Sequence, residues 1–204
     1  MSLFSKNELE KIEQTVVKLE KRTDAEIVTV HARQSDSYYY LPTLLAAVLA
    51  ILIPSILSLT PFWLETHEIL TIQVITFIVL SILLRLRVIL SRLIPKTTRE
   101  LRSSLMARYQ FMEQNLHTTE KNLGVLIFVS ELERHVEILV DNGVANKIED
   151  KVWQTHIHSL VQQIKRGNAC EGLIECINAI GDVLIIEFPI TRNKNELCNK
   201  LILI

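Results

Sequence analysis

Cysteine is scarce in this sequence, and its few copies are not arranged in pairs. The 204 residues include three cysteines, Cys170, Cys176 and Cys198, all late in the chain and without a CxxC spacing. An odd, unpaired set argues against a disulfide framework and against a zinc site built from paired cysteines. Cys170 and Cys176 fall in an apolar helical pattern, so we predict that both are small core residues. Unpaired cysteines also agree with a reducing compartment.

Long blocks of one charge sign and known catalytic motifs are missing as well. Lys and Arg number 22, Asp and Glu number 23, and the net charge is −1. This balance offers no basic surface, so we predict no nucleic acid partner. The sequence contains no GxSxG, HExxH, GxGxxG or Walker motif, which are the short signatures of common hydrolases and nucleotide-binding proteins.

Charge is entirely missing from two apolar runs, residues 41–60 and 69–84. About 20 apolar residues cross a hydrocarbon core of about 30 Å. We therefore predict that residues 39–94 form a transmembrane helical hairpin in a lipid bilayer, with the tyrosines at 38–40 at one interface. The alternative, a pair of core helices in a soluble protein, would be excessive in a domain of this size.

Basic residues flank the hairpin and are missing from the turn between its helices. The turn contains Glu65 and Glu68 but no Lys or Arg. The positive-inside rule then places both termini and the soluble domain in the cytoplasm. The densely charged N-terminus does not resemble a signal peptide. We predict a two-span protein of a bacterial-type inner (plasma) membrane. The flanking basic residues are Lys6, Lys11, Lys18, Lys21, Arg22 and Arg33 before the hairpin and Arg85, Arg87, Arg92, Lys96, Arg99 and Arg102 after it.

The flanking segments, 1–38 and 95–190, carry the helix and strand patterns of one α/β domain. Ser5 and Glu8 form a capping-box pattern at the start of the first helix. We predict that the first two strands are parallel, joined by a right-handed crossover, and that the third is antiparallel to the second. The tail, 191–204, is not assigned. The expected helices are 6–21, 97–117, 145–166 and 169–188, the expected strands are 26–33, 124–129 and 135–141, and the inward stripe of the second helix is Leu101, Leu105, Tyr109, Met112 and Leu116.

This topology brings acidic residues to one edge of the sheet, distal to the membrane. Asp24 and Glu26 begin the first strand, and Glu137 and Asp141 belong to the third. Clustered carboxylates suit a hard cation, so we predict a calcium or magnesium site at Asp24, Glu26, Glu137 and Asp141. The structural alternative is that Asp24 and Asp141 are turn residues, and that Asp141 or Asn142 caps the following helix.

Two further polar motifs are assigned mainly structural roles. Glu133 and Arg134 lie between the second and third strands, where we predict a surface ion pair that helps to hold the hairpin of strands. His156 and His158 are two residues apart on a helix and point to different faces, which is poor geometry for a metal.

Short motifs spread over the soluble segments together resemble the TPM domain. They are Ala107, Phe111, Thr119, GVLIFVS at 124–130, ER-x-VEI at 133–138, Trp153, IK-x-G at 164–167, Gly172-Leu173, Phe188-Pro189 and, near the N-terminus, T-x-AEIV at 23–28. The resemblance implies an α/β sandwich with a small mixed sheet flanked by helices. It also implies frequent membrane anchoring, calcium-binding acidic sites in some members, and the acid phosphatase activity described for a chloroplast-lumen member. Here the hairpin departs from the commonest pattern because it is inserted after the first strand, and the predicted side is cytoplasmic.

Two functions follow from these patterns. The first is a membrane-anchored binding or scaffold module that assists a membrane protein complex, because a compact domain is tethered to the bilayer without a recognised catalytic set. The second is a metal-dependent, acid phosphatase-like phosphomonoesterase, which rests on the resemblance and on the acidic edge. Transport is disfavoured because the two spans contain no ionisable residue.

Overall fold

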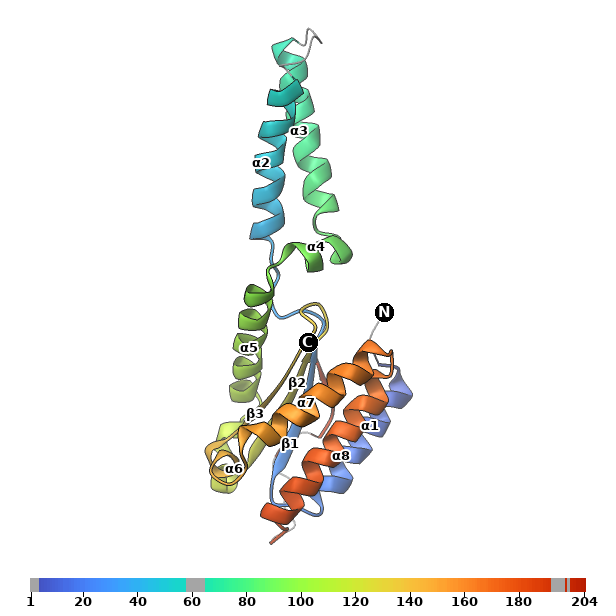
Figure 1. Cartoon of the computed structure of the whole chain (residues 1–204), viewed down its shortest axis with the longest axis vertical. Helices are drawn as coiled ribbons and strands as arrows, with labels where there is room; N and C mark the ends of the chain where they lie inside the picture. Colours follow the sequence, from blue (N-terminus) through green and yellow to red (C-terminus); the bar gives the residue numbers. More distant parts are fainter. Residues whose placement is uncertain (1–3, 58–64, 192–196, 198) are drawn as a thin grey trace. The chain divides into compact units, whose positions relative to one another are not determined.

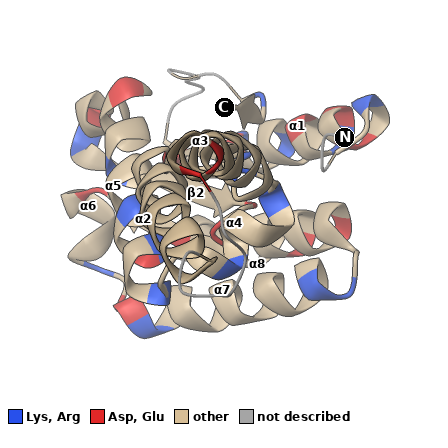
Figure 2. Ribbon diagram, turned by 90° about the horizontal axis from the view of Figure 1, so that it is seen from above, with Lys and Arg blue, Asp and Glu red and all other residues tan. Residues whose placement is uncertain are grey.

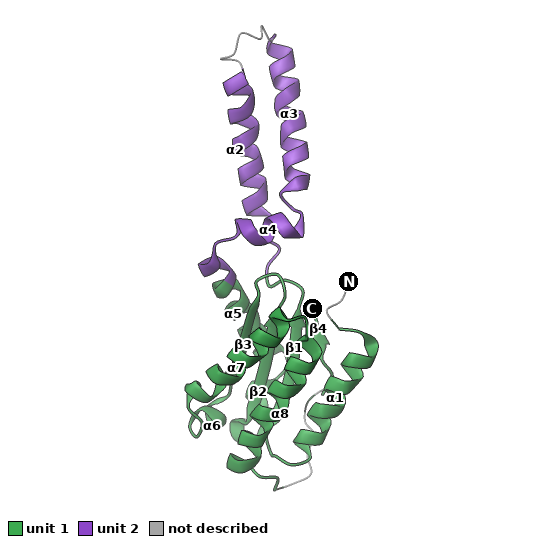
Figure 3. Cartoon of the chain, turned by 45° about the vertical axis from the view of Figure 1, so that its right-hand side comes forward, with its two compact units in different colours: residues 1–35, 100–204 green, residues 36–99 purple. Residues whose placement is uncertain are grey.

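The computed structural model describes residues 4–57, 65–191, 197 and 199–204. The chain divides into two compact units, which are coloured separately in Figure 3. The first unit consists of Met1–Ser35 and Glu100–Ile204, and the second of Asp36–Arg99. The second unit is thus an insertion into the first, and each unit is described by itself.

A four-stranded mixed sheet forms the centre of the first unit. The strands are β1 (Glu26–Ala32), β2 (Gly124–Ser130), β3 (His135–Val140) and β4 (Ile202–Leu203), in the order β3-β2-β1-β4. As predicted, β1 is parallel to β2 and β3 is antiparallel to β2. The unassigned tail adds β4, which pairs parallel with β1. Every residue of β1 and β2 is buried, which explains their nearly continuous apolar sequences.

Helices cover both faces of this sheet, so the predicted α/β class with a small mixed sheet flanked by helices is confirmed (Figure 1). On one face, α1 (Lys6–Glu20), α7 (Asp150–Lys165) and α8 (Ala169–Glu187) share a core with alternate strand residues. On the other face, α5 (Lys96–Glu113) packs by Ala107 against a second cluster. The predicted capping box of Ser5 and Glu8 begins α1. The short helices η1 (Leu116–Thr118), η2 (Glu120–Asn122) and α6 (Asn142–Ala145) connect the larger elements.

The predicted inward stripe of α5 is wrong. Leu101, Leu105, Tyr109 and Met112 are 60, 49, 58 and 55% exposed, whereas the buried residues of the helix are Ser103, Ala107 and Gln110. The face turned to the sheet is the one that carries Ala107, which packs in the second cluster, and Ser103, which hydrogen bonds to Ser35. These contacts, and not the apolar periodicity, decide which face of α5 is buried. Leu116 is buried as predicted, but it lies in η1 because α5 already ends at Glu113. An apolar stripe is therefore left on the outer face of α5.

The second unit contains two long helices, α2 (Tyr40–Leu57) and α3 (Thr66–Leu83), followed by α4 (Arg87–Leu93). The ribbon of α2 and α3 is uncharged except at the acidic start of α3 (Figure 2). The two helices pack against each other, and the buried residues of α2 are small or are prolines at every fourth position, Pro42, Ala46, Ala50 and Pro54. Such a seam is typical of closely packed membrane helices.

At one end of the second unit, Arg85 joins the two helices. Its guanidinium donates to Thr43 Oγ1 at 3.4 Å and lies 5.5 Å from the centre of the Tyr39 ring. Tyr39 and Tyr40 are exposed, whereas Tyr38 is fully buried. Of the three tyrosines at 38–40, two are thus on the surface, and their place at a membrane interface stays a prediction.

Candidate functional site

Three of the four carboxylates predicted to bind a metal lie at one edge of the sheet. Glu26 begins β1 opposite Gly124, and the Gly124 carbonyl accepts a hydrogen bond from the Asp141 amide at 2.9 Å. Asp24 lies just before β1. Glu137 is separate, because it lies opposite Phe128 within β3. There it accepts one hydrogen bond from the Ser104 hydroxyl at 2.5 Å and pairs with His135 at 3.1 Å. Partial burial alone would raise the pKa of the Glu137 carboxyl, but these bonds, with the charges of His135 and Arg108, lower it.

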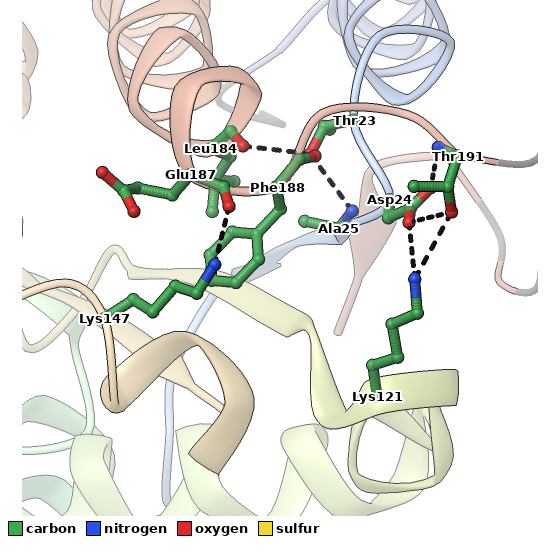
Figure 4. A network of polar contacts seen from close by, with 9 residues as sticks. All are labelled: Thr23, Asp24, Ala25, Lys121, Lys147, Leu184, Glu187, Phe188 and Thr191. Atoms are coloured by element: carbon green, nitrogen blue, oxygen red, sulfur yellow. Dashed lines mark hydrogen bonds and ion pairs between the residues drawn. The ribbon is translucent and has the colours of Figure 1, made fainter.

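Asp24 is bound by a lysine and a threonine from distant parts of the chain (Figure 4). Lys121 Nζ lies 2.9 Å from Asp24 Oδ2, and Thr191 donates its hydroxyl to the same oxygen at 2.6 Å and its amide to Oδ1 at 2.7 Å. Burial by itself raises the pKa of the Asp24 carboxyl, but the bonds from Thr191 and Lys121 and the lysine charge hold it well below its usual range. Asp24 is therefore a fixed, ionised anchor.

Residues next to Asp24 connect the C-terminal end of α8 to the start of β1 (Figure 4). Thr23 Oγ1 donates a hydrogen bond to the Phe188 carbonyl at 2.7 Å, and Thr23 Oγ1 also accepts a hydrogen bond from the Ala25 amide at 3.2 Å. Lys147 donates to the Glu187 carbonyl at 3.0 Å and lies 4.7 Å from the centre of the Phe188 ring. These contacts give the quoted motifs at 23–28 and 188–189 a physical role, which is to join the two ends of the domain sequence.

Asp141 has the capping role that the sequence left open as an alternative. Its Oδ1 accepts the Asn142 amide at 2.7 Å, and the residue is the N-cap of α6. Gly143, the next residue, must be glycine because a Cβ there would lie 2.3 Å from the Lys121 carbonyl oxygen. The Asp141 turn and the turn that carries Lys121 are therefore packed backbone to backbone.

The arrangement at this edge does not fit a resident calcium or magnesium ion. Lys121 supplies the positive charge that Asp24 would otherwise seek from a cation, and one Asp141 oxygen is used by the helix cap. Among the described residues, no group of three or more His, Cys, Asp or Glu side chains is placed to hold a metal ion. Ion binding by Asp24, Glu26, Glu137 and Asp141 stays a prediction from the sequence.

A buried carboxyl that the sequence did not single out lies beside this edge. Glu20, at the end of α1, is 6% exposed; it accepts the Ile27 amide at 3.0 Å and contacts the Asn199 side-chain amide. Burial, followed by the nearby Glu26 charge, outweighs the Ile27 hydrogen bond and raises the pKa of the Glu20 carboxyl to about 8. A Glu in the last turn of a charged amphipathic helix looks like a surface residue, so no sequence signal marks it.

Comparison with known proteins identifies the domain. Residues 86–183 match the family model of the TPM domain. The chain carries a TPM domain. A similar solved structure, the NMR structure of the BA42 protein from the psychrophilic bacterium Bizionia argentinensis, has a TM-score of 0.61 at 19% identity, covering 99% of this chain and 96% of that one. At this identity the likeness shows the fold alone. No curated protein matches the chain.

In this TPM domain, the Glu133-Arg134 motif is not a surface ion pair. Glu133 is 5% exposed and accepts the Ser35 amide at 2.9 Å and the Ser130 hydroxyl. Ser35 Oγ lies 2.9 Å from Ser130 Oγ and 3.4 Å from Ser103 Oγ. The buried carboxylate thus joins the ends of β1 and β2 to α5, which is an architectural role, as predicted, but inside the domain. We call Ser35, Ser103, Ser130 and Glu133 the serine–glutamate cluster.

The cysteines of the TPM domain that the structure describes are both buried in α8, as predicted. Burial raises the pKa of the Cys176 thiol to about 12 and also raises that of Cys170. Neither thiol is poised for reaction at neutral pH. Cys198 lies outside the described residues.

Proposed function

We propose that this chain is a membrane-anchored TPM-domain protein that acts as a binding or accessory module of a membrane protein complex. Its hairpin spans a bacterial-type inner membrane twice, and its domain and both termini are cytoplasmic. The proposal names no reaction, because no described geometry favours the phosphatase alternative. The acidic edge on which that alternative depends is held by Lys121 and Thr191.

The observation that carries the anchoring proposal is the exposure of apolar side chains on α2 and α3. No residue of α3 is buried. Soluble proteins rarely expose contiguous apolar patches of more than a few hundred Å², so a lipid environment is the natural cover for this surface. Both helices are long and apolar enough to cross a membrane. The exposed apolar residues of α3 include Leu70, Val74, Ile75, Phe77, Ile78, Val79, Ile82 and Leu83.

Fractionation of cells that express the full chain tests the anchor. We expect the protein in the membrane pellet after an alkaline carbonate wash and in the supernatant only after detergent is added. Recovery in the supernatant without detergent would contradict the proposal. A fluorescent reporter fused after Ile204 tests orientation, since it should fold and fluoresce only if that end is cytoplasmic.

The binding role is supported by the apolar stripe that α5 leaves outside. Leu101, Leu105, Tyr109 and Met112 are exposed, and an exposed apolar patch with polar neighbours is typical of an interaction surface. We expect a stable companion to co-purify with the chain from detergent-solubilised membranes. The double change Leu105→Glu and Tyr109→Glu should remove that companion. The change Glu100→Gln, also at an exposed position of α5, is the matched control and should retain it. Identical co-purifying sets from both variants would contradict a contact through this stripe.

A further inference from the structure

A hollow of about 370 Å³ lies between the turn that joins β2 to β3 and the C-terminal half of α7. Its walls are mainly apolar, with Val129, Val136, Val161 and Ile164 among the lining residues. The polar lining residues come from the strand ends and their turn, apart from Lys165 at the end of α7. They are Ser130, Glu131, Arg134, His135 and Lys165. This hollow is separate from the acidic edge, since it lies at the end of β2 and the start of β3.

Two cations at this hollow are exposed and not engaged by the fold. Within the described part of the chain, the side chains of Arg134 and Lys165 form no hydrogen bond or ion pair, whereas the other charged or titratable side chains of the lining have neighbours. Glu131 lies 3.7 Å from His31 Nε2, and His135 pairs with Glu137 at 3.1 Å. Arg134 and Lys165 therefore offer positive charge to a ligand, and the apolar wall of the hollow lies beside them.

The turn that presents Arg134 is held in place on several sides. The Glu131 amide donates to the Ala32 carbonyl at 2.9 Å, and the Leu132 amide donates to the Arg33 carbonyl at 3.2 Å. Glu133 is fixed by the serine–glutamate cluster. Arg134 itself has a φ of 53°, a left-handed conformation that favours glycine or asparagine. A rigid turn that keeps an arginine in this conformation loses little entropy when a ligand binds.

We propose that this hollow binds an anionic amphiphile, a phosphate ester with a short apolar body, such as the phosphate headgroup and first methylenes of an acidic lipid. Arg134 and Lys165 bind the phosphate oxygens, and the valine and isoleucine walls contact the hydrocarbon. The ligand class deepens the proposed binding function and rests on it. Its test uses the whole chain in a bilayer, where anchoring is scored separately by membrane extraction, so failure of one does not imply failure of the other.

The test is isothermal titration of the full chain, in phosphatidylcholine nanodiscs, with hexyl phosphate. Inorganic phosphate and hexanol are the two half-ligand arms, and empty nanodiscs give the background. We expect hexyl phosphate to bind at least about tenfold more tightly than either half, because a charge-assisted contact and the burial of several methylenes each contribute about a factor of ten or more. Equal binding of inorganic phosphate would overturn the amphiphile in favour of a free phosphate site, and heat equal to that of empty nanodiscs would overturn the site.

Three variants locate the binding. Arg134→Gly and Lys165→Gln should each weaken hexyl phosphate about tenfold, and the glycine should not disturb folding because it suits the left-handed backbone. Val161→Thr keeps the shape of the wall but adds a hydroxyl, so it should weaken hexyl phosphate without changing the response to inorganic phosphate. Lys151→Gln, an exposed lysine at the other end of α7, is the control and should bind as the wild type does. Unchanged binding by Arg134→Gly and Lys165→Gln would overturn the proposal.

Discussion

Glu20 makes the stability of the TPM domain depend on pH in a direction opposite to that of an ordinary surface carboxylate. Its pKa is about 8 in the folded chain because the side chain is buried beside Glu26, whereas an unfolded chain ionises near its ordinary value of about 4.3. Between these two values the folded state holds one more proton than the unfolded state. The free energy of unfolding therefore falls as pH rises through this window, and it is constant again above it.

The size of the effect follows from the two pKa values. Each pKa unit corresponds to about 1.4 kcal/mol, so a shift of this size corresponds to roughly 3 to 6 kcal/mol. Glu20→Gln removes the titration but keeps the side-chain length, the acceptor for the Ile27 amide and a polar group for Asn199. At pH 8.5 we expect the variant to be more stable than the wild type by several kcal/mol, or by on the order of 10 °C in Tm.

The assay is thermal and denaturant unfolding of the full chain in nanodiscs, followed by circular dichroism at pH 5 and pH 8.5. At pH 5, wild type and Glu20→Gln should differ by only about 1 kcal/mol, because this pH is just above the unfolded value and most of the window has not been crossed. Other titrating groups are common to both chains, so they cancel in the difference. Glu10→Gln, which changes an exposed residue of the same helix, should alter stability little at either pH. If the difference in free energy of unfolding between wild type and Glu20→Gln were the same at pH 5 and pH 8.5, the burial of Glu20 as an uncharged carboxyl would be refuted.

Three further predictions test other parts of the structure. Leu105→Ser on the outer face of α5 should change the free energy of unfolding by no more than about 0.5 kcal/mol, whereas Ala107→Leu on its buried face should cost about 1 to 3 kcal/mol; denaturant titrations would give the reverse order if the apolar stripe faced inward. Lys121→Met should move the acid-unfolding midpoint to higher pH, because the pKa of Asp24 then rises. The stabilising charge of Asp24, which is fully present above the ordinary carboxyl pKa, is then lost earlier as pH falls. An unchanged midpoint would show that the ion pair has no role. Glu133→Gln should cost about 1 to 3 kcal/mol by unfolding in denaturant, since it weakens a buried polar network, and no loss would contradict the architectural assignment.

The pairing of β1, β2 and β3 and the placement of the main helices could be predicted because they depend on local patterns and on general rules of chain connection, whereas β4 in the tail was not predicted. The apolar runs of β1 and β2, the alternation in β3 and the Ser5 capping box each have one simple interpretation. The face of α5 could not be predicted in this way. Its apolar stripe at Leu105 and Tyr109 has the correct helical period, but Ala107 is the residue that packs in the cluster beneath the helix. The apolar periodicity of a helix indicates that the helix is amphipathic. It does not indicate which face of the helix packs against the sheet.

The candidate site shows a second limit of sequence reasoning. The edge shared by Asp24, Glu26 and Asp141 follows from topology and was predicted, but the partners of Asp24 come from residues 121 and 191, far away in the chain. The same is true of Glu20, whose burial depends on contacts with β1 and the tail. Carboxylate residues can be recognised in a sequence. Which cations lie beside them and how far they are exposed to solvent depend on the folded structure.

The serine–glutamate cluster explains how the second unit can be inserted into this domain without disturbing it. Ser35 is the last residue of the first unit before the insertion, and Ser103 lies shortly after the chain returns. Their hydroxyl oxygens are 3.4 Å apart, and both residues are buried. The exit and re-entry points of the chain are therefore already held together by the fold. Loop-closure entropy depends only weakly on loop length. Because the two ends are held together by the fold, the length of the inserted segment has little effect on the stability of the domain. The fold can thus supply a rigid base from which β1 and α5 lead into and out of the second unit, and no other element of the sheet needs to change.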